Sequence, residues 1–200
     1  MALGQQGKDS LSVEEFMKAY AMTEAQGEPN PEIILGISNM YKEQKNYFNQ
    51  AVYLEKYLEA KGGNYDLRNN FALGRAYYSA DSFALADSVF KVMTEQKPDL
   101  YLGWQWDARS LAKMDPGSKE GLAKGAFERL MEIIAADEQL MTKYKSAYLE
   151  GARYLGAYYT LVTKECKEAI PYWEMILADK PEDAGAQQGL DYCKKVVEQQ

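Results

Sequence analysis

Small and aromatic side chains recur in this sequence at fixed spacing, most clearly between Leu67 and Leu100. In this stretch the recurring positions hold Leu73, Gly74, Tyr77, Phe83, Ala86, Phe90 and Pro98. Small residues let two helices approach closely, aromatic rings fill the volume around the crossing, and proline ends a helix. The spacing therefore predicts a pair of packed helices that is repeated along the chain.

The rest of the chain has the same helical texture and lacks the period-two alternation of strands. Glycine and proline punctuation predicts helices at 12–26, 31–44, 47–61, 64–80, 83–96, 99–113, 118–136, 138–163, 166–179 and 182–197. The connections are short, so consecutive helices should be antiparallel neighbours. Residues 1–11 are polar and rich in glycine and glutamine, and we expect them to form a disordered lead-in.

The spaced positions in 64–98 resemble the tetratricopeptide repeat, which has a period of about 34 residues. Two further units follow the pattern: 99–136 has Ala108 and a late Phe127, and 137–181 has Gly156 and Trp173 with one extra residue between its halves. The unit 31–63 is weaker, because Glu55 occupies a usual aromatic position. Residues 12–26 look like a partial repeat and 182–197 like a capping helix.

This resemblance, to bacterial tetratricopeptide-repeat proteins, implies an all-α fold. It would be a right-handed superhelical solenoid of antiparallel helix pairs, formed by residues 12–200 as one domain. Such proteins recognise other proteins, so the expected function is a non-catalytic interaction scaffold that binds a partner protein or peptide in its concave groove.

Composition narrows the chemistry further. The chain has no histidine, which excludes Ser-His-Asp and Cys-His catalysis and histidine-based zinc sites. A net charge of −7 argues against a nucleic-acid partner. We expect no enzyme activity, no cofactor, no metal site and no transmembrane segment, because no apolar run approaches the length of a membrane span. The compartment stays open: cytoplasmic, or periplasmic if an export signal lies outside this chain.

In the family that the sequence resembles, fixed positions of the first helix of each repeat face the ligand. The candidate groove residues are Arg68, Phe71, Arg75, Tyr78, Gln105, Arg109, Lys113 and Arg153. Four of the five arginines fall on such positions, and Arg75 and Arg109 should stand about 10 Å apart. An arginine row in an acidic protein favours an acidic partner segment. The alternative is that the arginines pair with Asp107, Glu150 or Glu138.

Two other functions remain open at this stage. Carbohydrate could stack on aromatic rings of the same groove, with Phe71 and Tyr78 as candidates and with Trp106 expected to be the more exposed tryptophan. Self-association could occur through an incomplete terminal repeat. The two cysteines, Cys166 and Cys193, could form a disulfide between the last two helices, although two buried free thiols are the favoured interpretation.

Overall fold

We analysed a computed structural model of the chain, which describes residues 2–27, 29–63 and 65–199. In these ranges the chain forms helices and no strand. The α-helices are α1 (Ala2–Ala25), α2 (Pro31–Glu43), α3 (Tyr47–Ala60), α4 (Leu67–Ser79), α5 (Phe83–Gln96), α6 (Tyr101–Met114), α7 (Lys124–Ala135), α8 (Glu138–Ala157), α9 (Cys166–Asp179) and α10 (Ala184–Glu198). A π-helical turn, η1 (Tyr158–Val162), continues α8.

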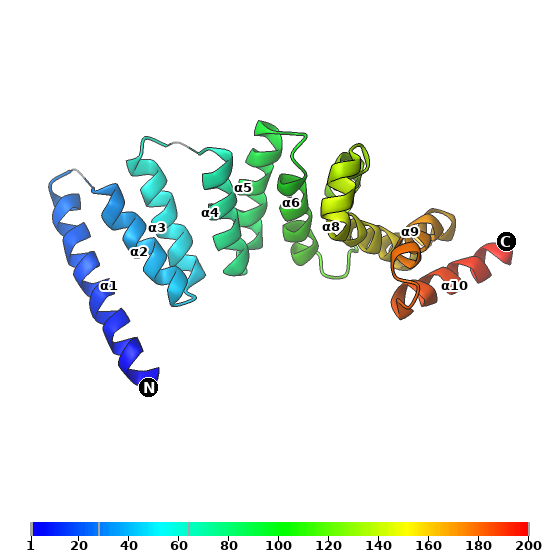
Figure 1. The fold of residues 1–200 in the computed structure, drawn as a ribbon, viewed down its shortest axis with the longest axis horizontal. Helices are drawn as coiled ribbons and strands as arrows, with labels where there is room; N and C mark the ends of the chain where they lie inside the picture. The colour runs from blue at the N-terminus through cyan, green and yellow to red at the C-terminus, as the bar shows by residue number, and fades with distance from the viewer. Residues whose placement is uncertain (1, 28, 64, 200) are drawn as a thin grey trace. The chain divides into compact units, whose positions relative to one another are not determined.

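Consecutive helices pack against each other, as the short connections predict. The pairs α2 and α3, α7 and α8, and α9 and α10 make extensive contacts, and Figure 1 shows the chain turning back between α2 and α3. Side-chain caps define several of the boundaries. Asn30 accepts hydrogen bonds from the Glu32 and Ile33 amides at the start of α2, and Asp66 accepts one from Asn69 at the start of α4.

The sequence predicts a helix that begins at Ser12, but helix α1 begins at Ala2 and so includes residues 2–11. This differs from the expected disordered lead-in.

The helices form two compact units, one up to Met93 and one from Thr94 onward. The sequence predicts a single domain, and no composition shift marks this division, which falls inside α5. In a repeat array each helix contacts only its neighbours, so an array can divide without a linker. Each unit is described by itself below.

Within both units, small residues lie where the two helices of a repeat cross. A Cβ atom added to Gly74 of α4 would stand 2.6 Å from Cζ of Phe90 in α5, and one added to Gly156 would stand 2.9 Å from Cε2 of Trp173 in α9. Ala86 of α5, another small position of the repeat pattern, is fully buried. The predicted pairing of small with aromatic positions is therefore confirmed.

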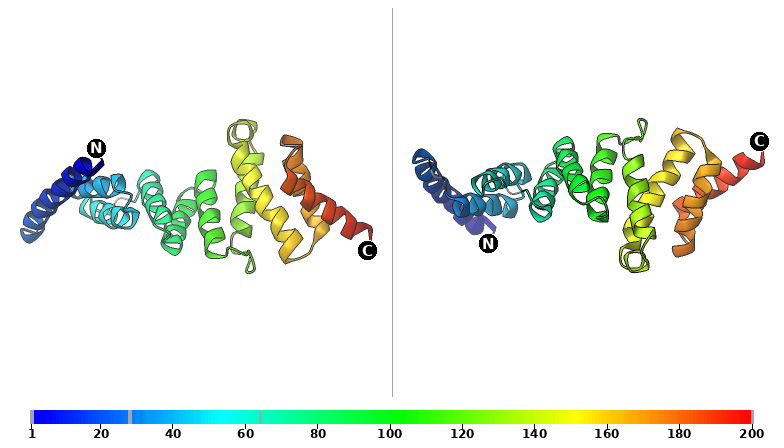
Figure 2. Two further views of the ribbon diagram at one scale, coloured as in Figure 1. Left: turned by 90° about the horizontal axis from the view of Figure 1, so that it is seen from below. Right: turned by 90° about the horizontal axis from the view of Figure 1, so that it is seen from above.

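A second set of glycines lies where a helix crosses the helix before it. Cβ atoms added to Gly36 of α2 and Gly151 of α8 would lie 2.6 Å from Phe16 and 2.8 Å from Met131 of the preceding helices. Gly189 of α10 approaches Trp173 of α9 in the same way, and Figure 2 shows these two helices, red and orange, packed together. Helix α1 thus packs against α2 as the second helix of one repeat packs against the first helix of the next. Helix α10 packs against α9 as the first helix of a following repeat would.

The loop before α7 is long, as the late position of Phe127 predicts, but α7 begins at Lys124 instead of near Ser118. The buried Asp115 carboxylate accepts hydrogen bonds from the amides of Lys119, Glu120 and Gly121 at 2.9, 3.0 and 3.0 Å. These bonds hold the amides in a loop instead of a helix. Ser118 and Gly121 have φ values of 50° and 65°, which a continuing helix does not allow.

The extra residue in the last repeat is accommodated by the π-helical turn. Helix α8 has a kink at Tyr144 and passes into η1 at Tyr158, so the long predicted helix at 138–163 is present but not uniform. A π turn holds one residue more than an α-helical turn, and single turns of this kind are the usual form.

The two cysteines are both buried and both free. Two effects raise the pKa of Cys166 to about 11: mainly its burial, and to a smaller extent the hydrogen bond with the neighbouring Cys193 thiol. The two thiols therefore lie close together between α9 and α10, as the sequence suggests, without a disulfide. Cys193 also lies 3.4 Å from the Thr160 hydroxyl.

Candidate functional site

In the first unit, the predicted groove residues lie along one stripe of α4. Arg68, Phe71, Arg75 and Tyr78 follow one another at intervals of three or four residues, which places them on one side of the helix. The side chains of Arg68 and Arg75 are exposed, and those of Phe71 and Tyr78 are half-buried.

The two aromatic rings of this stripe are held by neighbours from the same unit. The Arg75 guanidinium lies over the Phe71 ring, with 5.9 Å between its central carbon and the ring centroid. Tyr78 packs edge-on against Phe83 of α5, with ring centroids 5.3 Å apart. The stripe therefore presents two guanidinium groups on a base of fixed aromatic rings.

In the second unit, a hydrogen-bond network joins α6 to α8 at Glu150. Nε and Nη2 of Arg109 donate to the two carboxylate oxygens of Glu150 over 2.6 and 2.7 Å, and Nε2 of Gln105 donates to Oε2 over 3.0 Å. Both charged side chains keep 30% of their surface exposed. A bidentate pair fixes the plane of the guanidinium, so its remaining N–H groups point in set directions.

The Trp106 ring packs against the guanidinium of Arg109. The central carbon of the Arg109 guanidinium lies 4.6 Å from the centroid of the Trp106 ring, and only 9% of Trp106 is exposed. The expectation that Trp106 is the exposed tryptophan is therefore wrong, because the guanidinium covers its ring. Trp173 is buried, as its repeat position predicts, while Trp104 is only half-buried and donates to the Pro98 carbonyl.

One turn further along α8, Arg153 forms a salt bridge with Asp183, the residue that caps α10. The hydrogen bonds from Arg153 and from the Ala186 amide lower the pKa of the Asp183 carboxyl below its usual value. Beside this pair lies a depression of about 370 Å³, in which Lys145 of α8 also pairs with Asp179 of α9.

We call the surface formed by Arg109, Glu150 and Arg153 the A face of the second unit. Gln105, a predicted groove residue, is buried beneath it, with only 8% of its surface exposed. The A face carries fixed donors and acceptors of both signs. It is not a row of uncompensated arginines, because Glu150 and Asp183 neutralise Arg109 and Arg153. The alternative pairing that the sequence left open is thus present for Arg109 with Glu150.

The remaining sequence predictions divide as follows. Lys113 is exposed in the last turn of α6 and has no part in the Glu150 network. The expected 10 Å separation of Arg75 and Arg109 concerns residues of different units and stays a prediction. Asp183 and the pair of Lys145 with Asp179 were missed, because their partners lie on other helices and follow no repeat spacing.

Among the described residues, no group of three or more potential metal ligands is present. In the same part of the chain, no helix combines the length and the apolar character that crossing a membrane requires.

Comparisons with known proteins point to one kind of fold. The chain is similar to the crystal structure of the C-terminal part of a TPR repeat-containing protein from Cytophaga hutchinsonii, with 31% sequence identity and a TM-score of 0.72. The similarity covers 94% of this chain and 69% of that one. No protein-family model matches the chain, and no curated protein matches it.

Proposed function

Because the chain belongs to the tetratricopeptide-repeat family, we propose that it is a non-catalytic scaffold that binds a segment of a partner protein on the first helices of its repeats. The fold itself supports an interaction scaffold, since helical repeats of this kind typically lack catalysis and offer an extended binding surface. The partner segment and the residues that bind it are the finer part of the proposal.

The Glu150 network is the observation that carries this proposal. The repeat pattern predicts that Gln105, Arg109 and Glu150 lie on ligand-facing positions of two successive repeats. Arg109 and Glu150 are fixed to each other before any ligand arrives, and the buried Gln105 supports Glu150. Preorganised polar groups lose little conformational entropy on binding, so each contact with a partner retains more of its free energy. The depression beside Arg153 gives a partner side chain a place next to these groups.

A preference for acidic segments is supported by α4 more than by the A face. On α4, Arg68 and Arg75 are exposed beside aromatic rings. On the A face, a carboxylate from a partner would have to compete with Glu150 for Arg109. We therefore propose that acidic partner residues bind along α4, and that polar or mixed-charge residues bind the A face.

Carbohydrate binding receives less support than peptide binding. Of the two candidate rings, Phe71 lies under Arg75 and Tyr78 packs edge-on against Phe83. Trp106 is buried under Arg109. No ring of the A face offers a flat, open surface of the kind on which a sugar stacks.

The test begins with a partner purified from an extract of the source organism and identified by mass spectrometry. Its dissociation constant is then measured with the wild-type chain and with Arg109→Gln, which removes the charge and the bidentate pair. Arg129→Gln on α7 is the matched control, because Arg129 is the one arginine outside the predicted groove positions and forms an ion pair with Glu132 of its own helix.

We expect Arg109→Gln to weaken binding about tenfold or more, which corresponds to about 1.4 kcal/mol, and Arg129→Gln to leave it unchanged. The double variant Arg68→Gln with Arg75→Gln should weaken binding of a segment with acidic residues and have less effect once those residues are changed to amides. Equal loss with Arg109→Gln and Arg129→Gln would contradict the proposed site.

A further inference from the structure

A second pocket lies in the second unit, on the opposite side of α8 from Glu150. It occupies about 550 Å³ between α7, α8 and α9. Tyr148 and Leu155 of α8 line it, seven residues apart and thus on one side of the helix, whereas Glu150 lies on the other. Nothing in the Glu150 network contributes to this pocket, which we call the α7–α9 pocket.

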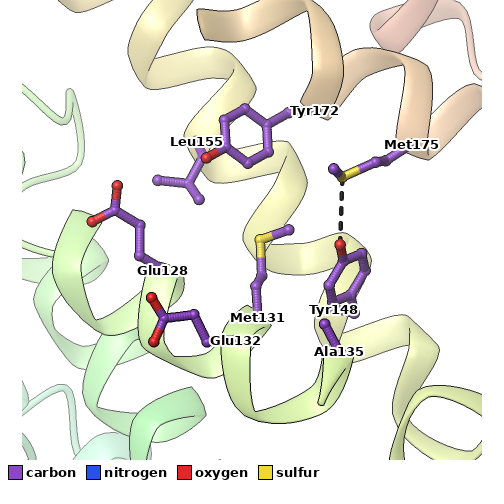
Figure 3. A pocket seen from close by; sticks show the side chains of 8 residues that line it. All are labelled: Glu128, Met131, Glu132, Ala135, Tyr148, Leu155, Tyr172 and Met175. Carbon is purple, nitrogen blue, oxygen red and sulfur yellow. Dashed lines mark hydrogen bonds between the residues drawn. The ribbon is translucent and has the colours of Figure 1, made fainter. Parts of the chain in front are cut away.

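The centre of the α7–α9 pocket is apolar and adaptable. Figure 3 shows Met131 pointing into it from α7, with Met175 and Tyr148 on one side and Tyr172 above. The Tyr148 hydroxyl contacts Sδ of Met175 at 3.6 Å, and 37% of Met175 is exposed. Methionine thioethers are flexible and polarizable, so they adapt to apolar side chains of different shape.

Two carboxylates stand on the α7 wall of the pocket, and no cation is among its lining residues. Glu132 is highly exposed, with 66% of its side chain accessible, and its Oε2 accepts a hydrogen bond from Nη1 of Arg129 of the same helix over 2.9 Å. Glu128 is fixed: Nζ of Lys124 donates to Oε1 over 2.7 Å, and the Tyr159 hydroxyl donates to the same oxygen over 3.4 Å. Both of these hydrogen bonds end on Oε1, so Oε2 of Glu128 can still act as an acceptor.

The ring of Tyr172 is also held in place. It stacks on Tyr159, with ring centroids 5.9 Å apart and an angle of 6° between the ring planes. A fixed tyrosine ring attracts a cation through its π face. The ion pair of Glu132 with Arg129 is solvent-exposed and contributes little stability, so a cation from a partner can replace Arg129 there. The net charge of −7 on the whole chain attracts a basic partner from a distance as well.

We propose that the α7–α9 pocket binds a segment of a partner protein that presents an arginine or lysine among apolar side chains. The cationic end would lie between Glu132 and Tyr172, near Glu128, and the aliphatic stem and its apolar neighbours would pack on Met131 and Met175. This is a second interaction surface, independent of the A face, so the scaffold can hold two partner segments of different chemistry.

The test uses a display library of random peptides, panned on the full chain with the double variant Glu128→Gln and Glu132→Gln as counter-target. Both substitutions keep the side-chain shape and remove the charge, and circular dichroism checks that the variant is folded. Enriched peptides are synthesised with each basic residue intact or changed to glutamine. Binding is followed through the methyl resonances of ¹³C-methyl-methionine in the chain.

We expect enriched peptides to carry an arginine or lysine flanked by apolar residues and to shift the methyl signals of Met131 and Met175. Changing the basic residue to glutamine, or using the double variant, should each weaken binding about tenfold or more. Glu198→Gln, an exposed carboxylate at the end of α10, is the matched control and should have no effect.

Three results would overturn the inference. The first is a panning that enriches nothing over the counter-target, and the second is a set of enriched peptides without a basic residue. The third is self-association of the chain that Glu132→Lys abolishes, which would assign the pocket to a second copy. Arg109→Gln should not affect these peptides, so the result is separate from the test of the A face.

Discussion

Replacing Gly189 by alanine should destabilise the second unit, although alanine is the better helix former. An ideal Cβ at Gly189 would stand 2.5 Å from Cε2 of Trp173 and 2.8 Å from its Nε1, whereas ordinary contact begins at 3.4 Å. The ring cannot move away easily. Its Nε1 donates to the Thr160 hydroxyl over 2.9 Å, and Gly156 presses on it from α8.

The magnitude follows from three contributions. Forcing a methyl group into a packed core costs about 1–3 kcal/mol, and losing the hydrogen bond from the Trp173 indole costs about 1 kcal/mol. The helix propensity of alanine returns about 1 kcal/mol relative to glycine. The free energy of unfolding should therefore fall by about 1–3 kcal/mol, and the midpoint of thermal unfolding by about 2–4 °C for each kcal/mol.

The assay is urea unfolding followed by circular dichroism, with Gly125→Ala as the matched control. Gly125 lies in α7, is exposed, and has no atom within 4 Å of an added Cβ, so the same substitution there should stabilise the chain by up to about 1 kcal/mol. Trp173→Phe should reduce the cost of Gly189→Ala, which a double-mutant cycle measures. Gly189→Ala that stabilises the chain as much as Gly125→Ala would refute the close-packing argument.

Three further predictions concern other groups of the second unit. Asp115→Ala should lower the free energy of unfolding by about 2–3 kcal/mol in urea titrations, because three backbone amides of the loop lose their common acceptor; an unchanged midpoint would contradict this. An NMR titration should find the pKa of the Asp183 carboxyl below the usual aspartate value, and Arg153→Gln should raise it. The stability that comes from this lowered pKa is present at neutral pH. It is lost as the pH falls through the pKa of the folded state. Ellman's reagent should detect both thiols, Cys166 and Cys193, in the unfolded, unreduced chain, and in the folded chain the reaction should be slow at pH 8 and faster towards pH 11, where the Cys166 thiolate forms.

The helix pairs could be predicted from the sequence because their determinants are local. Prolines and glycines mark the ends of the helices, and the recurrence of small and aromatic residues determines which faces pack. Gly74 opposite Phe90 and Gly156 opposite Trp173 follow directly from that spacing. The start of α7 was not predictable in this way, since it depends on Asp115 binding amides four to six residues later.

The candidate site was predicted only in part, for a physical reason. The repeat pattern predicts ligand-facing positions for Gln105, Arg109 and Arg153, but it does not show that Gln105 is buried or which carboxylates reach the arginines. Glu150 lies 41 residues from Arg109 in sequence, and Asp183 lies 30 residues from Arg153. Pairing over such separations depends on how neighbouring repeats are packed, and one sequence contains no signal for it. The same holds for the guanidinium that covers Trp106.

The central claim is that partner segments bind on the first helices of the repeats. Hydrogen–deuterium exchange of the backbone amides, measured with and without a captured partner, tests it most directly. The account predicts slower exchange along α4, α6 and α8, with the change in α6 and α8 weakened by Arg109→Gln. Slower exchange confined to α5, α7 and α9, with α4, α6 and α8 unchanged, would contradict it.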